Sequence, residues 1–146
     1  MLFYIHLSAT LLLCGIIWFV QLIHYPLFVS VGRSAFEKYE KVHTQRVFRL
    51  IAPLMFIELS SGILLFAFPP FKLIMPLHLL GFVFLILIWV STFLIQTPIH
   101  SRLLEGFKPK ALRMLIMTNW IRTLAWTLRA IIVVLMISDW EDVLGL

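Results

Sequence analysis

The sequence predicts an all-α integral membrane protein, a single domain built as a bundle of four transmembrane helices. Of its 146 residues, 62% are hydrophobic and only 13% are charged. Its mean hydropathy of +1.02 is too high for a soluble domain of this size. The apolar residues fall into four runs, each long enough for a helix of the roughly 20 residues that cross a bilayer. The chain therefore has room for four spans and short connections.

The four runs predict helices over residues of about 2–25, 48–68, 73–104 and 111–138. The first run lacks a basic leader and is too long for the apolar part of a signal peptide, so we expect it to be retained. Pro26 is expected to end it. The charged segment that follows is predicted as a connection with an amphipathic or extended start to the second helix. Pro53 is expected to kink the second helix near its entry.

The basic residues predict the orientation in the membrane. The first and third connections and the adjoining helix ends hold nine of the twelve lysines and arginines: Arg33, Lys38, Lys41, Arg46, Arg49, Arg102, Lys108, Lys110 and Arg113. The opposite side holds Lys72. The positive-inside rule then places both connections in the cytoplasm and both termini on the non-cytoplasmic side, with a bacterial cytoplasmic (inner) membrane as the expected location.

The same composition narrows the class of partner. The basic residues flank membrane helices and form no exposed patch, which argues against nucleic acid as a partner. A lone cysteine, Cys14, excludes an intrachain disulfide and a cysteine-built zinc site. The lipid bilayer and a hydrophobic small molecule are the expected partners, and a homo-oligomer or a larger membrane complex stays open.

Two arginines, Arg122 and Arg129, lie inside the fourth apolar run. An ionisable side chain at such a depth is costly and marks a functional site by default. Glu58 is the only acidic residue in the predicted spans, so it can neutralise only one of the two. We expect Glu58 and Arg129 to form a structural ion pair. Arg122 is then left to meet water, a carbonyl group or an anionic ligand.

Polar and aromatic side chains recur at helical spacing on three of the predicted helices. These stripes hold Cys14, Trp18, Gln21 and either His24 or Tyr25, then Trp89, Thr92, Gln96 and His100, then Asn119, Arg122, Trp126 and Arg129. Such stripes should face the interior of a membrane bundle, which predicts a polar funnel open to the cytoplasm. Its substrate-lining residues are expected to be Trp18, Gln21, Gln96 and Trp126. The alternative for Gln21, Gln96 and Asn119 is hydrogen bonding between helices.

Three histidines are predicted near the cytoplasmic end of the funnel: His24, His43 and His100. They are candidates for metal ligands or for proton transfer. His24 and His100, at equal predicted depth, could also clamp a haem. The cofactor therefore stays open between none, haem and a metal ion. His6 and His78 lie on the other side of the membrane and receive no role.

Two segments, QTPIHSRLLEGF and TNWIRTLAWTLRAII, together with HYPLF, carry a resemblance to a known family. The chain resembles the anthrone oxygenase-like family of small four-helix membrane proteins through Pro26, Pro98–Leu103, Asn119 and Arg122, with His100 in place of the usual asparagine. The resemblance implies oxidation by O₂ of a planar, easily deprotonated phenolic substrate without an obvious cofactor. The funnel and the resemblance together make His24, His100, Asn119 and Arg122 the expected catalytic residues, a histidine removing a proton and Arg122 stabilising the anion.

Three functions therefore follow from the sequence. The first is an oxygenase-like membrane oxidoreductase acting on a phenolic or quinone-like small molecule. The second is a haem- or metal-binding membrane protein. The third is a non-enzymatic accessory subunit of a larger membrane complex, in which the buried charges only hold helices together.

Overall fold

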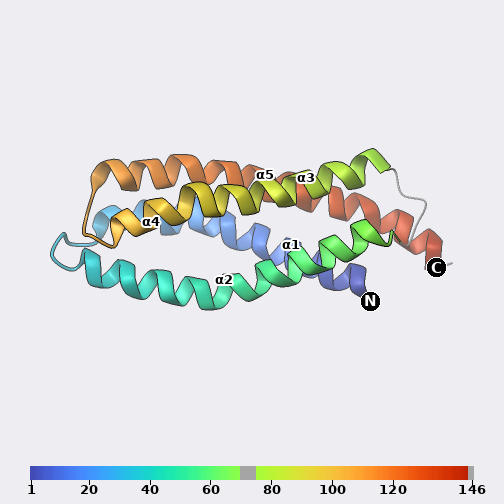
Figure 1. Ribbon diagram of the computed structural model, residues 1–146, viewed down its shortest axis with the longest axis horizontal. Helices are drawn as coiled ribbons and strands as arrows, with labels where there is room; N and C mark the ends of the chain where they lie inside the picture. Colours follow the sequence, from blue (N-terminus) through green and yellow to red (C-terminus); the bar gives the residue numbers. More distant parts are fainter. Residues whose placement is uncertain (70–74, 145–146) are drawn as a thin grey trace.

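The computed structural model describes residues 1–69 and 75–144, which contain helices and no strand. Four rods form the bundle, and two of them are interrupted by short turns of other helix types (Figure 1). In chain order the elements are α1 (Leu2–Phe19), η1 (Val20–His24), η2 (Pro26–Ser30), α2 (Phe36–Ala67), α3 (Met75–Ser91), η3 (Thr92–Gln96), α4 (Thr97–Leu103) and α5 (Pro109–Leu144). Each rod is long and apolar enough to cross a membrane, as predicted.

Several helix ends differ from the prediction. The first rod continues past Pro26 to Ser30, because Pro26 takes the first position of the 3-10 turn η2, where its missing N–H is not needed. α2 begins at Phe36, about three turns before residue 48, because the charged segment is an amphipathic helix. α5 runs from Pro109 to Leu144, longer than predicted at both ends. The predicted start of the third helix, at 73, lies outside the described residues.

Pro53 does not interrupt α2, which is helical on both sides of it. It lies about halfway along the helix, where Figure 1 shows α2 change direction. A proline inside a helix removes one backbone hydrogen bond and crowds the preceding turn, which explains a bend at this position.

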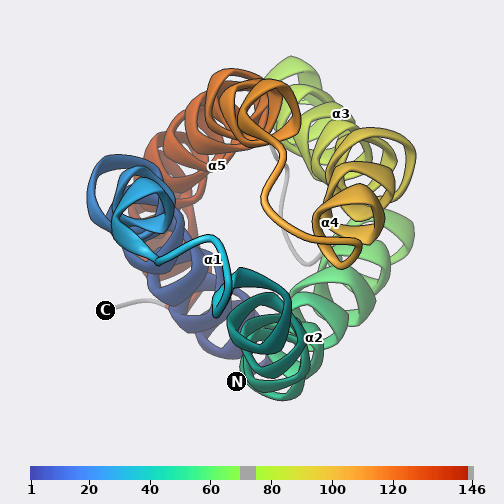
Figure 2. The same cartoon turned by 90° about the vertical axis from the view of Figure 1, so that its left-hand side faces the viewer.

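Seen along the bundle axis, the rods follow one another as α1, α2, the α3–η3–α4 rod and α5 (Figure 2). α1 packs closely on α2 and α5, and α3 packs closely on α5, whereas α2 contacts α3 and α4 more loosely. The outside carries many large exposed apolar side chains, among them Leu12, Phe48, Phe93, Leu124 and Leu135. An outer surface of this kind suits contact with lipid.

The two ends of the bundle differ in what they carry. Both described chain ends, the end of α2 and the start of α3 lie at one end, and the α1–α2 and α4–α5 connections lie at the other (Figure 1). In the α4–α5 connection Gly106 has φ of 115°, a conformation that favours glycine. Exposed Lys108 there donates a hydrogen bond that lowers the pKa of Glu105. The side of the membrane on which the termini lie stays a prediction.

Candidate functional site

A cavity of about 590 Å³ lies inside the bundle between α1, α2, the α3–η3–α4 rod and α5. Its size is that of a small-molecule site. Most of its wall is apolar, and its polar lining includes Tyr25, His43, Thr92, Gln96, His100 and Arg122. The exposed side chains of Phe48, Phe93 and Leu104 also line it, so the cavity reaches the outer surface of the bundle between α2 and the η3–α4 segment.

Arg122 lines this cavity and is 9% exposed. Its Nε donates to Asn119 Oδ1 at 2.9 Å, and its Nη2 donates to the hydroxyl of Tyr25 at 3.4 Å. Asn119 in turn donates to Gln21 Oε1 at 2.8 Å, so the amide that holds the guanidinium is itself held. No carboxylate of the described residues lies within 4.0 Å of Arg122. The buried cation is oriented but not neutralised.

A chain of hydrogen bonds leads from Arg122 toward α2. The Tyr25 hydroxyl is 3.0 Å from His100 Nε2, and His100 Nδ1 is 2.6 Å from Glu40 Oε1. Glu40 is fully buried, and its second oxygen, Oε2, has no hydrogen-bond partner. His43 lies beside this pair, and its Nδ1 is 2.9 Å from Nε2 of His24.

The structure replaces one of the three metal ligands expected from the sequence: Glu40 takes the place of His24 beside His43 and His100. Glu40, His43 and His100 each offer one ligand atom, and these atoms lie within 4.8 Å of one another. His24 is outside this group and contacts it through His43. The ring of His43 packs against those of both His24 and His100, at centroid distances of 4.7 and 5.6 Å. A porphyrin clamped between His24 and His100 does not fit this arrangement.

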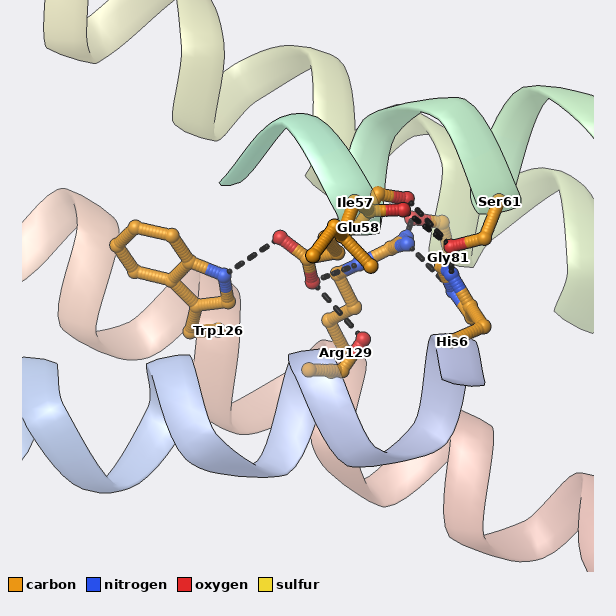
Figure 3. A network of polar contacts seen from close by, with 8 residues as sticks. His6, Ile57, Glu58, Ser61, Gly81, Trp126 and Arg129 are labelled. Carbon is orange, nitrogen blue, oxygen red and sulfur yellow. Dashed lines mark hydrogen bonds and ion pairs between the residues drawn. The ribbon is translucent and has the colours of Figure 1, made fainter. Parts of the chain in front are cut away.

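A second polar network is centred on Glu58, which is fully buried between α1 and α5 (Figure 3). Arg129 Nε donates to Glu58 Oε1 at 2.9 Å, so the two residues expected to pair form an ion pair. Thr10 donates to the same oxygen at 2.9 Å, and Trp126 Nε1 donates to Oε2 at 3.1 Å. Both carboxylate oxygens therefore accept hydrogen bonds.

The other end of this network explains His6, which the sequence left without a role. Arg129 donates to the carbonyl oxygen of Gly81 and, at 2.8 Å, to His6 Nε2. Because a guanidinium only donates, Nε2 must accept, and the proton of His6 lies on Nδ1. Nδ1 is 2.7 Å from Ser61 Oγ, which donates to the carbonyl of Ile57 at 2.6 Å. Each of the side chains in this series of hydrogen bonds, from Glu58 through Arg129 and His6 to Ser61, therefore has a hydrogen-bond partner.

Two of the four predicted lining residues line the cavity and two do not. Gln96 and Trp126 line it. Trp18 instead donates to Thr127 at 2.9 Å on α5, and Gln21 donates to the backbone of α5 and accepts from its side chains. The reason is the rotation of the rod formed by α1 and η1, whose cavity face carries the apolar residues Leu13, Ile16, Ile17 and Val20.

The remaining site residues occupy supporting positions. Asn119 holds Arg122 and does not line the cavity, and neither does His24. His78 is buried and stacks on Phe66 at 5.5 Å, and the structure gives it no role. Of the two alternatives for the end of the first stripe, Tyr25 lines the cavity and His24 does not. Glu40 is new to the site. The signal for Glu40 was its spacing of three residues from His43, which places both on one face of a helix.

Two π-helical turns, η1 and η3, border the site. A π turn inserts an extra residue into a helix and occurs often at functional sites. η1 carries Gln21 and His24, and η3 carries Thr92 and Gln96. Thr92 accepts a hydrogen bond from Arg122 Nη1 at 3.5 Å, and Gln21 accepts one from Asn119, the amide that holds Arg122.

No family model, curated protein or solved structure matches this chain. Its function must therefore be argued from the site itself.

Proposed function

We propose that this protein is an integral membrane oxidoreductase of an oxygenase-like kind, acting on a membrane-soluble phenolic or quinone-like molecule in the cavity. The observation that supports it most is Arg122, a buried cation on the cavity wall with no carboxylate partner among the described residues. A buried charge without a counter-charge is costly, and an electron-rich oxygen of a ligand would offset that cost.

The lining favours a planar, mostly apolar molecule that carries oxygen. Trp89, Phe93 and Trp126 supply aromatic surface, while Tyr25 and Arg122 supply hydrogen-bond donors in one region of the wall. The opening between α2 and the η3–α4 segment faces the lipid-contacting surface. A molecule dissolved in the bilayer can enter there without passing through water.

The proposed chemistry uses the polar groups in order. The chain from Tyr25 through His100 to Glu40 offers a path for the hydroxyl proton of the bound phenol. Arg122 stabilises the anion that remains. O₂ then oxidises a CH₂ group of the activated ring system to C=O, and its second oxygen atom leaves as water with the two hydrogen atoms.

The test is a titration of detergent-purified protein with 2-naphthol and with 1,4-naphthoquinone, followed by quenching of tryptophan fluorescence. Arg122→Gln should weaken binding by about 10–100-fold, since a hydrogen bond to a charged group contributes about 1.5–3 kcal/mol. The matched control is Arg113→Gln, an exposed arginine on the same helix. Equal affinity in both variants would refute the proposal for binding. No O₂ uptake with a bound phenol whose ring system carries the CH₂ group that the step oxidises would refute it for catalysis.

We also propose the orientation that the basic residues predict, with both termini on the non-cytoplasmic side of a bacterial inner membrane. The two basic connections lie together at the end of the bundle opposite the chain ends, which supports a single orientation (Figure 1). A C-terminal alkaline phosphatase fusion should be active and a C-terminal green fluorescent protein fusion dark. The reverse result would invert the orientation.

A further inference from the structure

We propose that Glu40, His43 and His100 bind one divalent transition-metal ion at the edge of the cavity. The inference extends the proposed function, on whose cavity it rests, by naming a cofactor class for the same site. Three independent features of the cluster support it: the placement of its donor atoms, the unsatisfied carboxylate oxygen and the hydrogen bonds around its histidines.

The donor atoms come from two separate elements that meet at one point. Glu40 and His43 are three residues apart on α2, so both project from the same face, and His100 approaches from α4. A Glu-x-x-His pair facing a ligand on another helix is the arrangement by which other four-helix bundles hold metal ions. The donors lie within 4.8 Å of one another. Bonds of about 2.0–2.2 Å require donors no more than about 4.3 Å apart, which small side-chain rotations achieve.

Glu40 is the feature that is hardest to explain without a cation. It is fully buried, and His100 is the partner of its Oε1. Its Oε2 is buried without a hydrogen-bond partner. Buried polar atoms in proteins are nearly always paired, so an unpaired carboxylate oxygen needs a specific reason. A metal ion would satisfy this oxygen.

The hydrogen bonds around the two histidines direct one ring nitrogen of each toward the cluster. Nε2 of His100 is engaged by the Tyr25 hydroxyl, which leaves Nδ1 as the ligand atom. With the ion bound, Nδ1 ligates it and no longer donates to Glu40, so the proton path from Tyr25 to Glu40 belongs to the metal-free protein. Nδ1 of His43 is engaged by His24, which leaves Nε2. Metal-ligating histidines have this kind of outer partner, which fixes the tautomer and the ring orientation. Tyr25 also separates the cluster from the positive charge of Arg122.

The donor set defines the class of ion. Two imidazoles and one carboxylate suit Zn²⁺, Fe²⁺ or Co²⁺, and three protein ligands leave further positions open for water or substrate. His43 and His100 both line the cavity, so those open positions can be reached by a bound molecule. The site thus has the composition of a reactive metal centre and not of a closed structural one.

The test is a titration of chelator-treated, detergent-purified protein with Co²⁺, followed by its visible absorbance, with Zn²⁺ as competitor and elemental analysis for stoichiometry. An anaerobic titration with Fe²⁺ gives its affinity for comparison with the affinities of Co²⁺ and Zn²⁺. We expect one ion per chain. Glu40→Gln removes a ligand and should weaken Co²⁺ binding by more than about 100-fold. Tyr25→Phe removes only the outer hydrogen-bond partner of His100 and should weaken Co²⁺ binding by about 10–100-fold. The matched control Glu37→Gln, exposed one turn earlier on α2, should bind as the wild type does.

If Glu40→Gln does not fold, as judged by gel filtration and circular dichroism, His43→Gln replaces it with the same expectation. Absence of a stoichiometric ion, or equal Co²⁺ affinity in wild type and the folded ligand variant, would overturn the inference. The 2-naphthol titration is done on metal-free protein. Naphthol binding without metal binding would overturn the metal site alone, and metal binding without naphthol binding would overturn the proposed ligand alone.

Discussion

Removing the charge of Glu58 should destabilise the bundle strongly. In Glu58→Gln the guanidinium of Arg129 keeps its contacts with Gly81 and His6 but loses its only counter-charge among the described residues. The new amide also has one acceptor oxygen where the carboxylate had two. It can still accept from Arg129, but its NH₂ group then faces the indole N–H of Trp126, donor against donor.

The magnitude follows from these two losses. Breaking a buried ion pair by removing one partner costs about 3–5 kcal/mol, because the remaining charge is uncompensated. The unpaired N–H of Trp126 adds about 1–3 kcal/mol. The free energy of unfolding should therefore fall by about 4–8 kcal/mol in total. The double variant Glu58→Gln with Arg129→Gln should lose less than the sum of the single variants, because no isolated charge remains.

The assay is reversible unfolding in mixed micelles with increasing SDS, followed by circular dichroism, for the wild type, both single variants and the double variant. The exposed Glu105→Gln is the control, since its pair with Lys108 is on the surface. A loss below about 1 kcal/mol for Glu58→Gln, or strict additivity in the double variant, would refute a buried and coupled pair.

Three further predictions concern packing and positioning. Gly62→Ala should be less stable than Gly15→Ala by about 1–3 kcal/mol in the same SDS assay, because a Cβ at 62 would lie 2.9 Å from Leu85 Cδ2, whereas a Cβ at 15 would meet no described atom within 4 Å beyond the neighbouring turns of its own helix. Equal stabilities would contradict this. Trp126→Phe should cost about 1–3 kcal/mol through the lost hydrogen bond to the carboxylate, and a neutral result would show that this bond is not formed. Asn119→Leu should weaken 2-naphthol binding by releasing the guanidinium it holds, and unchanged affinity would count against a positioning role.

The number of spans and their approximate positions could be predicted because hydropathy is a property of whole segments. The start of α2 could not. Its first three turns bury Phe36, Glu40 and His43, and two of these three are polar, so a search for apolar periodicity finds no buried face. For the same reason the sequence did not predict Glu40 as a site residue. A buried acid in a charged segment looks like a solvated one until the fold brings His100 against it.

The different surroundings of the two arginines could be anticipated, because one acid in the spans cannot neutralise two cations. The partners around them could not. Thr10 lies four residues after His6, and Ser61 lies three residues after Glu58, so each pair shares one face of its helix. Nothing in either segment alone shows that these two faces meet, as they do through the bonds from His6 to Ser61 and from Thr10 to Glu58. The rotation of α1, which turns Trp18 away from the cavity, depends on packing against α5 and leaves no trace in the pattern of one helix.

The central claim is that Arg122 is an unneutralised cation that holds a ligand in the cavity. Native mass spectrometry of the protein released from mild detergent tests it most directly, comparing wild type with Arg122→Gln and with the exposed control Arg113→Gln. The account predicts a small aromatic, oxygen-bearing molecule on the wild type and on the control, and its loss from Arg122→Gln. The same molecule retained at equal occupancy by Arg122→Gln would contradict it.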